Sequence, residues 1–337
     1  MVRPPALPLH LVTGFLGSGK TTLINRVLRE PGFAGSMVVI NEFGEVGLDQ
    51  LIAGTADDNV LLLESGCLCC AASGTLRDTL IDLFSRRAAG SLPPFDRVIV
   101  ETSGLANPGP IVSGLLGDSA LRGRCELAQV LVLVDAVHGQ ATLERHDEAV
   151  RQVAFGDRIV LTKAQEAPSG HAQALADRVR QLNPHAEFLV MAPDIPATAY
   201  FGQPARRAQP AGGSWVRGPL HGQYGADAPA HGEAFRRIAT HSFAVTTPVD
   251  WPAYAQWCDQ LRRRFGARLL RCKGLLALGD AGRLHVVQGV QGFFAPPVPF
   301  DGPAAPGFIV CIGEGIAREE LAAAFDLLQP TTTGTPT

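Results

Sequence analysis

The first half of the chain alternates short, continuous apolar runs with segments in which apolar residues recur every three or four positions. Continuous runs are typical of strands buried on both faces, and the recurring pattern is typical of helices. This alternation predicts a mostly parallel sheet covered by helices on both faces. The predicted strands are Leu7–Thr13, Met37–Asn41, Asn59–Glu64, Arg97–Glu101, Val130–Asp135 and Arg158–Thr162, and the predicted helices are Lys20–Arg29, Thr75–Ser85, Pro110–Leu116, His146–Phe155 and His171–Leu182.

This pattern stops at about residue 191, where proline and glycine become frequent, and order returns near residue 237. Strands outnumber helices from there on, which predicts a small α+β domain with an antiparallel sheet. We therefore expect a first domain at 1–190, a linker at 191–236, a second domain at 237–329 and a disordered tail at 330–337. The predicted strands are Thr240–Val245, Leu269–Leu278, Leu284–Val290 and Phe308–Ile312, and the predicted helices are Trp251–Phe265 and Arg318–Leu328.

Composition agrees with this division and narrows the functional classes. The chain has 337 residues, of which 46% are hydrophobic and 18% charged, enough for two domains with their own cores. Its formal net charge of −3 predicts no binding to nucleic acid or to an anionic membrane surface. The sequence contains no apolar run of the ~20 residues that a membrane span needs, and its first residues, Met1–Gly14, predict a short lead-in and a strand rather than a signal peptide. Seven cysteines, three of them clustered, predict a protein of the reducing cytoplasm, and the oligomeric state stays open, a homodimer included.

A phosphate-binding loop follows the first predicted strand. The segment Gly14–Thr21 matches G-x-x-x-x-G-K-[ST] between a strand and a helix, a context that disfavours an ordinary glycine-rich turn. Its glycines let backbone N–H groups converge on phosphates at a helix N-terminus. We expect Lys20 to reach the β- and γ-phosphates and the Thr21 hydroxyl to ligate Mg²⁺. The expected nucleotide-binding residues of this segment are Gly14, Gly17, Ser18, Gly19, Lys20, Thr21 and Thr22.

The apolar strand Arg97–Glu101 ends in a carboxylate, the arrangement expected of a Walker B strand. Glu101 would hold Mg²⁺ through water or orient the attacking water, and the turn Thr102–Gly104 would meet the γ-phosphate. A helix-capping or surface glutamate is the alternative, and the nearby phosphate loop disfavours it.

Three thiols, Cys67, Cys69 and Cys70, lie between these two motifs. Thiolates bind Zn²⁺ and other soft or borderline ions. On an extended segment Cys67 and Cys69 point to one side, and Cys70 joins them only if a turn redirects it. Glu42 or Glu45 can supply a further ligand. A redox thiol pair and a set of buried, inert cysteines are the alternatives. The remaining cysteines occur singly, which predicts core positions: Cys125, Cys258, Cys272 and Cys311.

Taken together, these segments and the carboxyl-terminal half resemble the CobW-type metallochaperone GTPases, relatives of the urease and hydrogenase accessory GTPases. The resemblance covers nearly the whole chain. It implies a P-loop NTPase fold, a first switch at Asn41–Asp49 and a Walker B strand with a second switch at Glu101–Pro108. The segments Leu269–Leu275 and Val287–Gln291 are similar to the family's C-terminal domain, which is thought to contact partner or metal.

The resemblance also implies the chemistry. It implies a GTPase that requires Mg²⁺, binds Zn²⁺ or Co²⁺ at the Cys-x-Cys-Cys run and delivers the metal to a client protein. Nucleotide binding would reposition the first switch and the strand that leads to the thiols, so that metal affinity changes with nucleotide state. A nucleotide-gated regulatory module with negligible turnover and a redox-sensing NTPase remain the alternatives. The implied catalytic residues are Lys20, Glu101 and Glu42, and the implied transition-metal ligands are Cys67, Cys69, Cys70 and Glu42.

This chain departs from the family pattern in two places. The base-reading motif Asn/Thr-Lys-x-Asp is here Thr162-Lys163-Ala164-Gln165, and these residues are the expected base-side contacts. An Asp carboxylate accepts two hydrogen bonds from guanine, whereas the amide of Gln165 offers one acceptor and one donor group. This change weakens guanine preference unless Glu166 substitutes for the missing carboxylate. The linker also lacks the dense histidine run of many relatives, which argues against high-capacity metal storage.

Overall fold

The computed structural model describes residues 6–40, 60–62, 72–202, 237–302 and 305–328. The chain divides into two compact units. The described residues up to Gly202 belong to the first unit, and those from Arg237 onward belong to the second.

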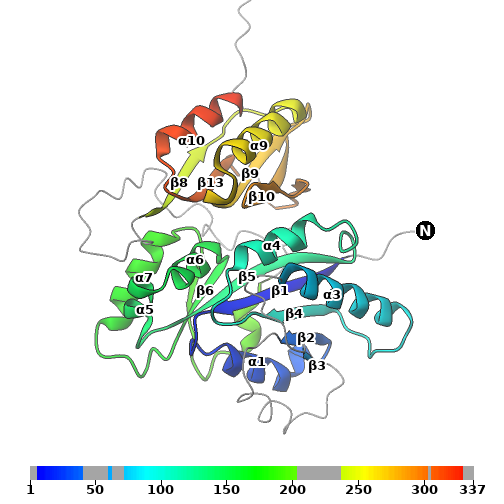
Figure 1. Ribbon diagram of the computed structural model, residues 1–337, viewed down its shortest axis with the longest axis vertical. Coiled ribbons are helices and arrows are strands. Elements are labelled where there is room, and N and C mark those ends of the chain that lie inside the picture. The colour runs from blue at the N-terminus through cyan, green and yellow to red at the C-terminus, as the bar shows by residue number, and fades with distance from the viewer. Residues whose placement is uncertain (1–5, 41–59, 63–71, 203–236, 303–304, 329–337) are drawn as a thin grey trace, which may run out of the picture. The chain divides into compact units, whose positions relative to one another are not determined.

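The first unit is built on a seven-stranded sheet with the order β3-β2-β4-β1-β5-β6-β7 (Figure 1). Every neighbouring pair is parallel, as the continuous apolar runs predicted. The central strand β1 lies between β4 and β5, so that its end meets the ends of both. The strands are β1 (Leu7–Gly14), β2 (Ser36–Ile40), β3 (Val60–Leu62), β4 (Arg97–Glu101), β5 (Cys125–Asp135), β6 (Arg158–Thr162) and β7 (Glu187–Val190).

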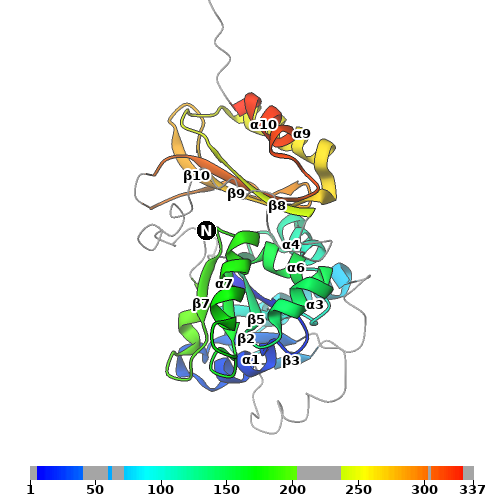
Figure 2. The ribbon, with the colours of Figure 1, turned by 90° about the vertical axis from the view of Figure 1, so that its left-hand side faces the viewer.

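Helices cover both faces of this sheet (Figures 1 and 2). On one face, Leu23 and Ile24 of α1 pack in a common core with Val12 of β1 and Tyr200. Helices α4 and α6 lie on the other face. No helix in the described parts of the chain is long and apolar enough to span a bilayer. The helices are α1 (Lys20–Arg29), α3 (Ala72–Ala88), α4 (Pro108–Gly117), α5 (Gly139–Arg145), α6 (Asp147–Phe155) and α7 (His171–Leu182), with short 3₁₀ turns η1 (Pro31–Phe33) and η2 (Ala197–Tyr200).

All six predicted strands and all five predicted helices of this unit are present, four of them with the predicted bounds: Arg97–Glu101, Arg158–Thr162, Lys20–Arg29 and His171–Leu182. Two elements, β7 and α5, were not predicted. Strand β7 is at the sheet edge and only partly buried, and it was not predicted although Phe188, Leu189 and Val190 form a continuous apolar run. Strand β5 begins at Cys125 rather than Val130, because its first residues are partly exposed and mix polar with apolar types.

The predicted linker does not begin at residue 191. The described segment from Met191 to Gly202 packs onto the first unit and contains η2. A carboxylate oxygen of Glu30 accepts from the Ala197 N–H at 2.6 Å, and the Gln129 amide donates to the Tyr200 carbonyl at 3.2 Å. Prolines prevent a long helix here, but buried Tyr200 gives the segment an anchor. The rest of the predicted linker and the predicted tail lie outside the described residues.

The second unit contains a six-stranded antiparallel sheet with the order β11-β10-β9-β13-β8, in which β12 also pairs with β10. Helices α9 and α10 lie on one face of it (Figures 1 and 2), around the fully buried Trp257. This arrangement confirms the predicted α+β class. The elements are β8 (Ile238–Ala244), α9 (Trp251–Phe265), η3 (Gly266–Arg268), β9 (Leu269–Leu278), β10 (Arg283–Val290), β11 (Phe293–Phe294), β12 (Val298–Pro299), β13 (Phe308–Glu314), α10 (Arg318–Phe325) and η4 (Asp326–Leu328).

Candidate nucleotide-binding site

The phosphate loop connects the end of β1 to the start of α1. Gly14, Gly17 and Gly19 have positive φ angles of 145°, 73° and 94°, which glycine adopts readily. A Cβ atom at Gly14 would also lie 2.4 Å from the Leu133 carbonyl oxygen, so no side chain fits there. The helix begins directly at Lys20, and its first N–H groups are therefore available to an anion at the loop.

Two lysines donate hydrogen bonds to carbonyl groups of this loop. The Lys20 Nζ donates to the carbonyls of Gly14 at 2.9 Å and Phe15 at 3.2 Å. The Lys163 Nζ donates to the Gly17 carbonyl at 2.8 Å and to Asp135 at 2.7 Å. Two ammonium groups thus lie at the loop that is expected to receive a polyphosphate, which favours an anionic ligand.

Thr21 and Glu101 meet at the start of α1. Parallel pairing sets Glu101 of β4 opposite Val12 of β1, which brings the carboxylate to the phosphate loop. Glu101 is buried, and its Oε1 accepts a hydrogen bond from the Thr21 hydroxyl at 3.3 Å. A hydroxyl beside a carboxylate offers the hard oxygen ligands that Mg²⁺ prefers, so the two side chains fit the predicted magnesium site.

The turn after β4 lies against the phosphate loop. The Thr102 hydroxyl donates to the Thr13 hydroxyl at 2.8 Å. A Cβ atom at Gly104 would lie 2.8 Å from the Leu16 backbone nitrogen, so only glycine allows this close approach. The buried amide of Gln152 donates to the carbonyls of Gly104 and Ala106, each at 3.0 Å. A role for Gln152 was not predicted from the sequence. An uncharged polar residue on the apolar face of α6 does indicate a buried side chain with hydrogen-bond partners.

Asp135 is the last residue of β5, and the sequence did not predict a role for it in the site. Its carboxylate accepts from Lys163, from the Val137 N–H at 2.7 Å and from the His138 N–H at 3.2 Å. Burial raises the pKa of Asp135, but the hydrogen bonds from Lys163 and these neighbours outweigh burial, and the pKa lies below its usual range. Asp135 therefore stays ionised at neutral pH and holds Lys163 beside the loop.

A cavity of about 470 Å³ lies where the base of a nucleotide is expected. The Thr162 hydroxyl donates to the Ser18 carbonyl at 2.8 Å, which joins the end of β6 to the phosphate loop. Gln165 and Glu166 both line the cavity, so a carboxylate is present although the family's Asp is not. The complete lining is Gly19, Thr22, Arg26, Thr162, Lys163, Ala164, Gln165, Glu166, Met191, Ala192 and Pro193.

Arg26, which the sequence reading also missed, shapes this cavity. Its guanidinium donates to the Ala192 carbonyl at 3.2 Å and to the Ile195 carbonyl. Helix α1 therefore holds the loop after β7 that lines the cavity, which explains why the segment after residue 190 belongs to the nucleotide-binding unit.

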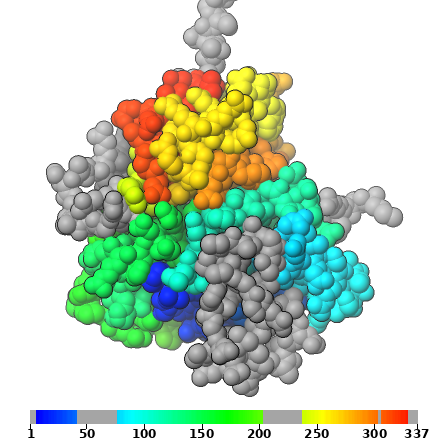
Figure 3. Space-filling view, in the orientation of Figure 1, coloured from blue at the N-terminus to red at the C-terminus, as the bar shows by residue number. Residues whose placement is uncertain are grey.

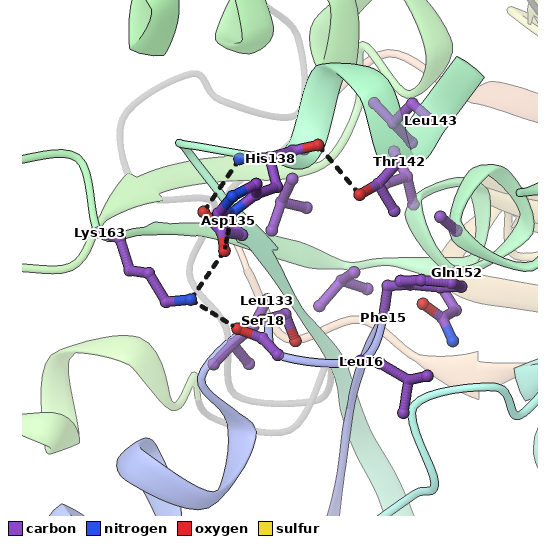
Figure 4. A pocket seen from close by; sticks show the side chains of 16 residues that line it. Phe15, Leu16, Ser18, Leu133, Asp135, His138, Thr142, Leu143, Gln152 and Lys163 are labelled. Atoms are coloured by element: carbon purple, nitrogen blue, oxygen red, sulfur yellow. Dashed lines mark hydrogen bonds and ion pairs between the residues drawn. The ribbon is translucent and has the colours of Figure 1, made fainter. Parts of the chain in front are cut away.

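A second cavity, of about 330 Å³, lies beside the phosphate loop (Figure 4). Phe15, Leu16, Leu143 and Val153 give it an apolar wall, and Asp135 and Lys163 line its polar end. Leu16 is 59% exposed. In the space-filling view, blue atoms of the N-terminal segment reach the surface beside green atoms (Figure 3).

The predicted transition-metal site lies outside the described residues. The predicted ligands belong to the ranges 41–59 and 63–71, so their role stays a prediction: Cys67, Cys69, Cys70, Glu42 and Glu45. Within the described ranges, no group of three or more His, Cys, Asp or Glu side chains is placed to hold a metal ion.

The single cysteines are buried or partly buried, as predicted. Burial raises the pKa of Cys125 and of Cys258 to about 12, which keeps both thiols protonated. Cys272 and Cys311 face each other across β9 and β13, with their sulfur atoms 3.7 Å apart.

Comparisons with known proteins agree with this geometry. Residues 8–190 match the family model described as CobW/HypB/UreG, nucleotide-binding domain. Residues 238–328 match the model described as cobalamin synthesis protein cobW C-terminal domain.

Individual relatives extend the match over most of the chain. The zinc chaperone YjiA of Escherichia coli is 33% identical over 323 residues, which are 95% of this chain and 98% of that protein. The zinc-regulated GTPase metalloprotein activator 1 of Schizosaccharomyces pombe is 26% identical over 192 residues, covering 54% of this chain and 45% of that protein. The crystal structure of Zn(II)-bound YjiA GTPase superposes with a TM-score of 0.68 at 25% identity, covering 97% of this chain and all of that one.

Proposed function

Because the chain belongs to the CobW/HypB/UreG family, we propose that it is a GTPase that binds a transition metal and delivers it to a client protein. The proposed metal is zinc. One observation carries the nucleotide half of this proposal: the phosphate loop with Lys20 and the Thr21–Glu101 pair at its end. The metal half rests on the thiol motif Cys67–Cys70 and on relatives that are named zinc chaperones.

The described contacts suggest how the chain's own residues act on a nucleoside triphosphate. Lys20 would exchange the Gly14 and Phe15 carbonyls for oxygens of the β- and γ-phosphates, where its charge stabilises the transition state. Thr21 and Glu101 would hold Mg²⁺, which supplies charge neutralisation on the phosphates. The turn Thr102–Gly104 would meet the terminal phosphate, because Gly104 lies against the loop.

The base is proposed to be guanine, with Glu166 in place of the missing Asp. Guanine presents two adjacent donors, and a carboxylate accepts both, whereas the amide of Gln165 accepts only on its oxygen. Both side chains line the base cavity. Glu166→Gln should therefore lower the preference for GTP over ATP by about ten-fold to 100-fold, since one charge-assisted hydrogen bond contributes about 1.5–3 kcal/mol. Gln165→Ala is the matched control and should leave the preference nearly unchanged.

The metal site is proposed to be the output of the nucleotide switch. Glu42 follows β2, which pairs with β4 and its Glu101, and Cys67, Cys69 and Cys70 follow β3, which pairs with β2. A change at the terminal phosphate would reach these segments and alter the affinity for metal.

Two measurements test the proposal. The first is steady-state phosphate release from GTP and ATP with Mg²⁺, in which GTP should be the better substrate. Binding without turnover would favour the regulatory binding module instead. The second is elemental analysis of protein isolated under reducing conditions from its native cell, together with thiol counting. Zinc at about one equivalent supports the proposal, cobalt would change the metal, and oxidised thiols without metal would favour a redox sensor.

A further inference from the structure

Gln152 is a buried polar residue in helix α6 that makes specific contacts. It is 1% exposed, and its neighbours on the inward face of the helix, Ala149 and Val153, are apolar. Burying an amide is unfavourable unless it is hydrogen-bonded. Its Nε2 donates to the carbonyls of Gly104 and Ala106 at 3.0 Å each. Because only the NH₂ group can donate to two carbonyls, the orientation of the amide is fixed.

The two carbonyls belong to the turn that connects β4 to α4. Residues 102–107 of this turn contain no helix or strand, so few backbone hydrogen bonds hold them. Gly104 nevertheless approaches the phosphate loop so closely that a Cβ atom would lie 2.7 Å from the Leu16 side chain and 2.8 Å from its backbone nitrogen. The hydrogen bonds from Gln152 therefore hold in position the turn that is expected to contact the terminal phosphate.

The same helix also contacts the phosphate loop. The ring of His146, which precedes the first turn of α6, stacks on the ring of Phe15 with centroids 4.5 Å apart and planes at 29°. The Phe15 carbonyl in turn accepts a hydrogen bond from Lys20 at 3.2 Å. Figure 4 shows Phe15 and Gln152 among the residues that line the same cavity. One helix thus contacts both segments that surround the expected terminal phosphate.

We infer that Gln152 is a positioning residue that holds the Gly104–Ala106 turn over the phosphate loop, so that the chain distinguishes nucleoside triphosphates from diphosphates. This inference rests on the proposed nucleotide site. Gln152 does not touch the nucleotide in this mechanism; it keeps Gly104 in place for the γ-phosphate. A diphosphate does not reach the turn, and its affinity therefore does not depend on Gln152.

The test compares Gln152→Met with a matched variant of Asn183, the residue that follows α7 and donates to carbonyls at the end of α6. Methionine keeps the length and helix propensity of glutamine but donates no hydrogen bond. Asn183 is another buried amide, which donates to the Val153 and Gly156 carbonyls at 2.9 Å each, far along the chain from the turn. Asn183→Leu thus removes similar bonds without involving Gly104. The readouts for each full-length variant are the affinities for GDP and for the non-hydrolysable analogue GMPPNP, with thermal unfolding and GTP turnover alongside.

Gln152→Met should lower the affinity for GMPPNP about ten-fold and change the affinity for GDP less than two-fold. The reason is that the variant loses two neutral hydrogen bonds that order the turn. Asn183→Leu should lower thermal stability and leave the GMPPNP-to-GDP ratio of affinities unchanged. If Gln152→Met does not fold, Gln152→Asn serves, because its amide is one methylene too short to reach both carbonyls. The inference is overturned if the folded variant of Gln152 keeps the wild-type ratio of GMPPNP to GDP affinities, or if Asn183→Leu changes this ratio equally. Absence of GTP turnover in the wild-type chain instead overturns the proposed activity, since the affinity ratio does not depend on turnover.

Discussion

The two units differ in where their strands place side chains that can take part in chemistry. In the first unit the strands are parallel, and their carboxyl ends bring Glu101, Asp135 and Thr162 together around the phosphate loop. In the second unit the strands are antiparallel, and Cys272 and Cys311 lie buried in mid-strand, in contact with each other. Parallel strands all end at one edge, where loops are free to bind ligands, whereas mid-strand side chains of the second unit belong to a core. We therefore expect variants in the first unit to change nucleotide binding and variants in the second to change stability.

The largest expected effect is on the rate of GTP hydrolysis when Lys20 rather than Lys273 is replaced. The chain has three lysines, and two of them, Lys20 and Lys163, donate to carbonyls of the phosphate loop, whereas Lys273 belongs to β9 of the second unit. Lys20→Met should lower the rate of GTP hydrolysis by about 100-fold or more, because a preorganised positive charge at the phosphates is lost. Lys273→Met should leave the rate within about two-fold. Equal losses in single-turnover assays would mean that the second unit takes part in the chemistry.

The next contrast concerns two glycines that have no room for a side chain. A Cβ atom at Gly104 would clash with Leu16 of the phosphate loop, and one at Gly274 would lie 2.2 Å from the Phe308 carbonyl in the second sheet. Gly104→Ala should weaken triphosphate binding by about ten-fold or more, since the turn must move off the loop. Gly274→Ala should lower the melting temperature and spare nucleotide affinity. Calorimetric titration and thermal unfolding of both variants check this pair, and exchanged phenotypes would refute the division of roles.

The buried thiols of the second unit sharpen the comparison. Cys272→Ala should cost about 1–2 kcal/mol of unfolding free energy, because the thiol is 1% exposed and fills core space. The zinc content should stay at the wild-type value, because burial raises the pKa of Cys272 well above its usual range and disfavours the thiolate that a metal needs. Loss of zinc from this variant, but not from Cys67→Ala/Cys69→Ala, would mean that the metal binds in the second unit, which contradicts this prediction.

The smallest expected effect is a pH dependence of the first unit. His10 of β1 is buried, and burial lowers its pKa to about 4 from 6.5, helped by the charges of Arg97 and Arg158. A lowered folded-state pKa means that the unfolded chain binds the proton more readily, so the stability contribution is present above pH 6.5 and is lost as the pH falls towards 4. This residue should make the first unit about 1 kcal/mol less stable at pH 5.5 than at pH 7.

Hydrogen exchange with mass spectrometry on the full chain follows the two units separately. Protection of β1 should fall between pH 7 and 5.5, after correction for the intrinsic exchange rate. His10→Phe keeps a ring beside Phe201, whose centroid lies 5.4 Å from that of His10, and should flatten the pH dependence. An unchanged pH dependence in this variant would assign it to other groups.

The sequence predicted the central strands and the phosphate loop because both depend on local pattern. Buried parallel strands are continuous apolar runs, and the loop motif has fixed spacing between a strand and a helix. It did not predict Gln152, Arg26 or Asp135, because their roles depend on contacts between residues far apart in the chain. The edge strand β7 was also not predicted, although Phe188, Leu189 and Val190 form a continuous apolar run. The thiol site stays a prediction because Cys67, Cys69 and Cys70 lie outside the described residues.

The central claim is that nucleotide state and metal affinity are coupled. The most direct test measures the affinity for GMPPNP and for GDP with and without Zn²⁺, in the wild-type chain and in Cys67→Ala/Cys69→Ala. The account predicts that Zn²⁺ changes the affinity of the wild type for one nucleotide more than for the other. By linkage, nucleotide must change the zinc affinity by the same factor, and the double variant should lose the effect. A GMPPNP-to-GDP ratio of affinities that Zn²⁺ leaves unchanged in the wild type would contradict the account.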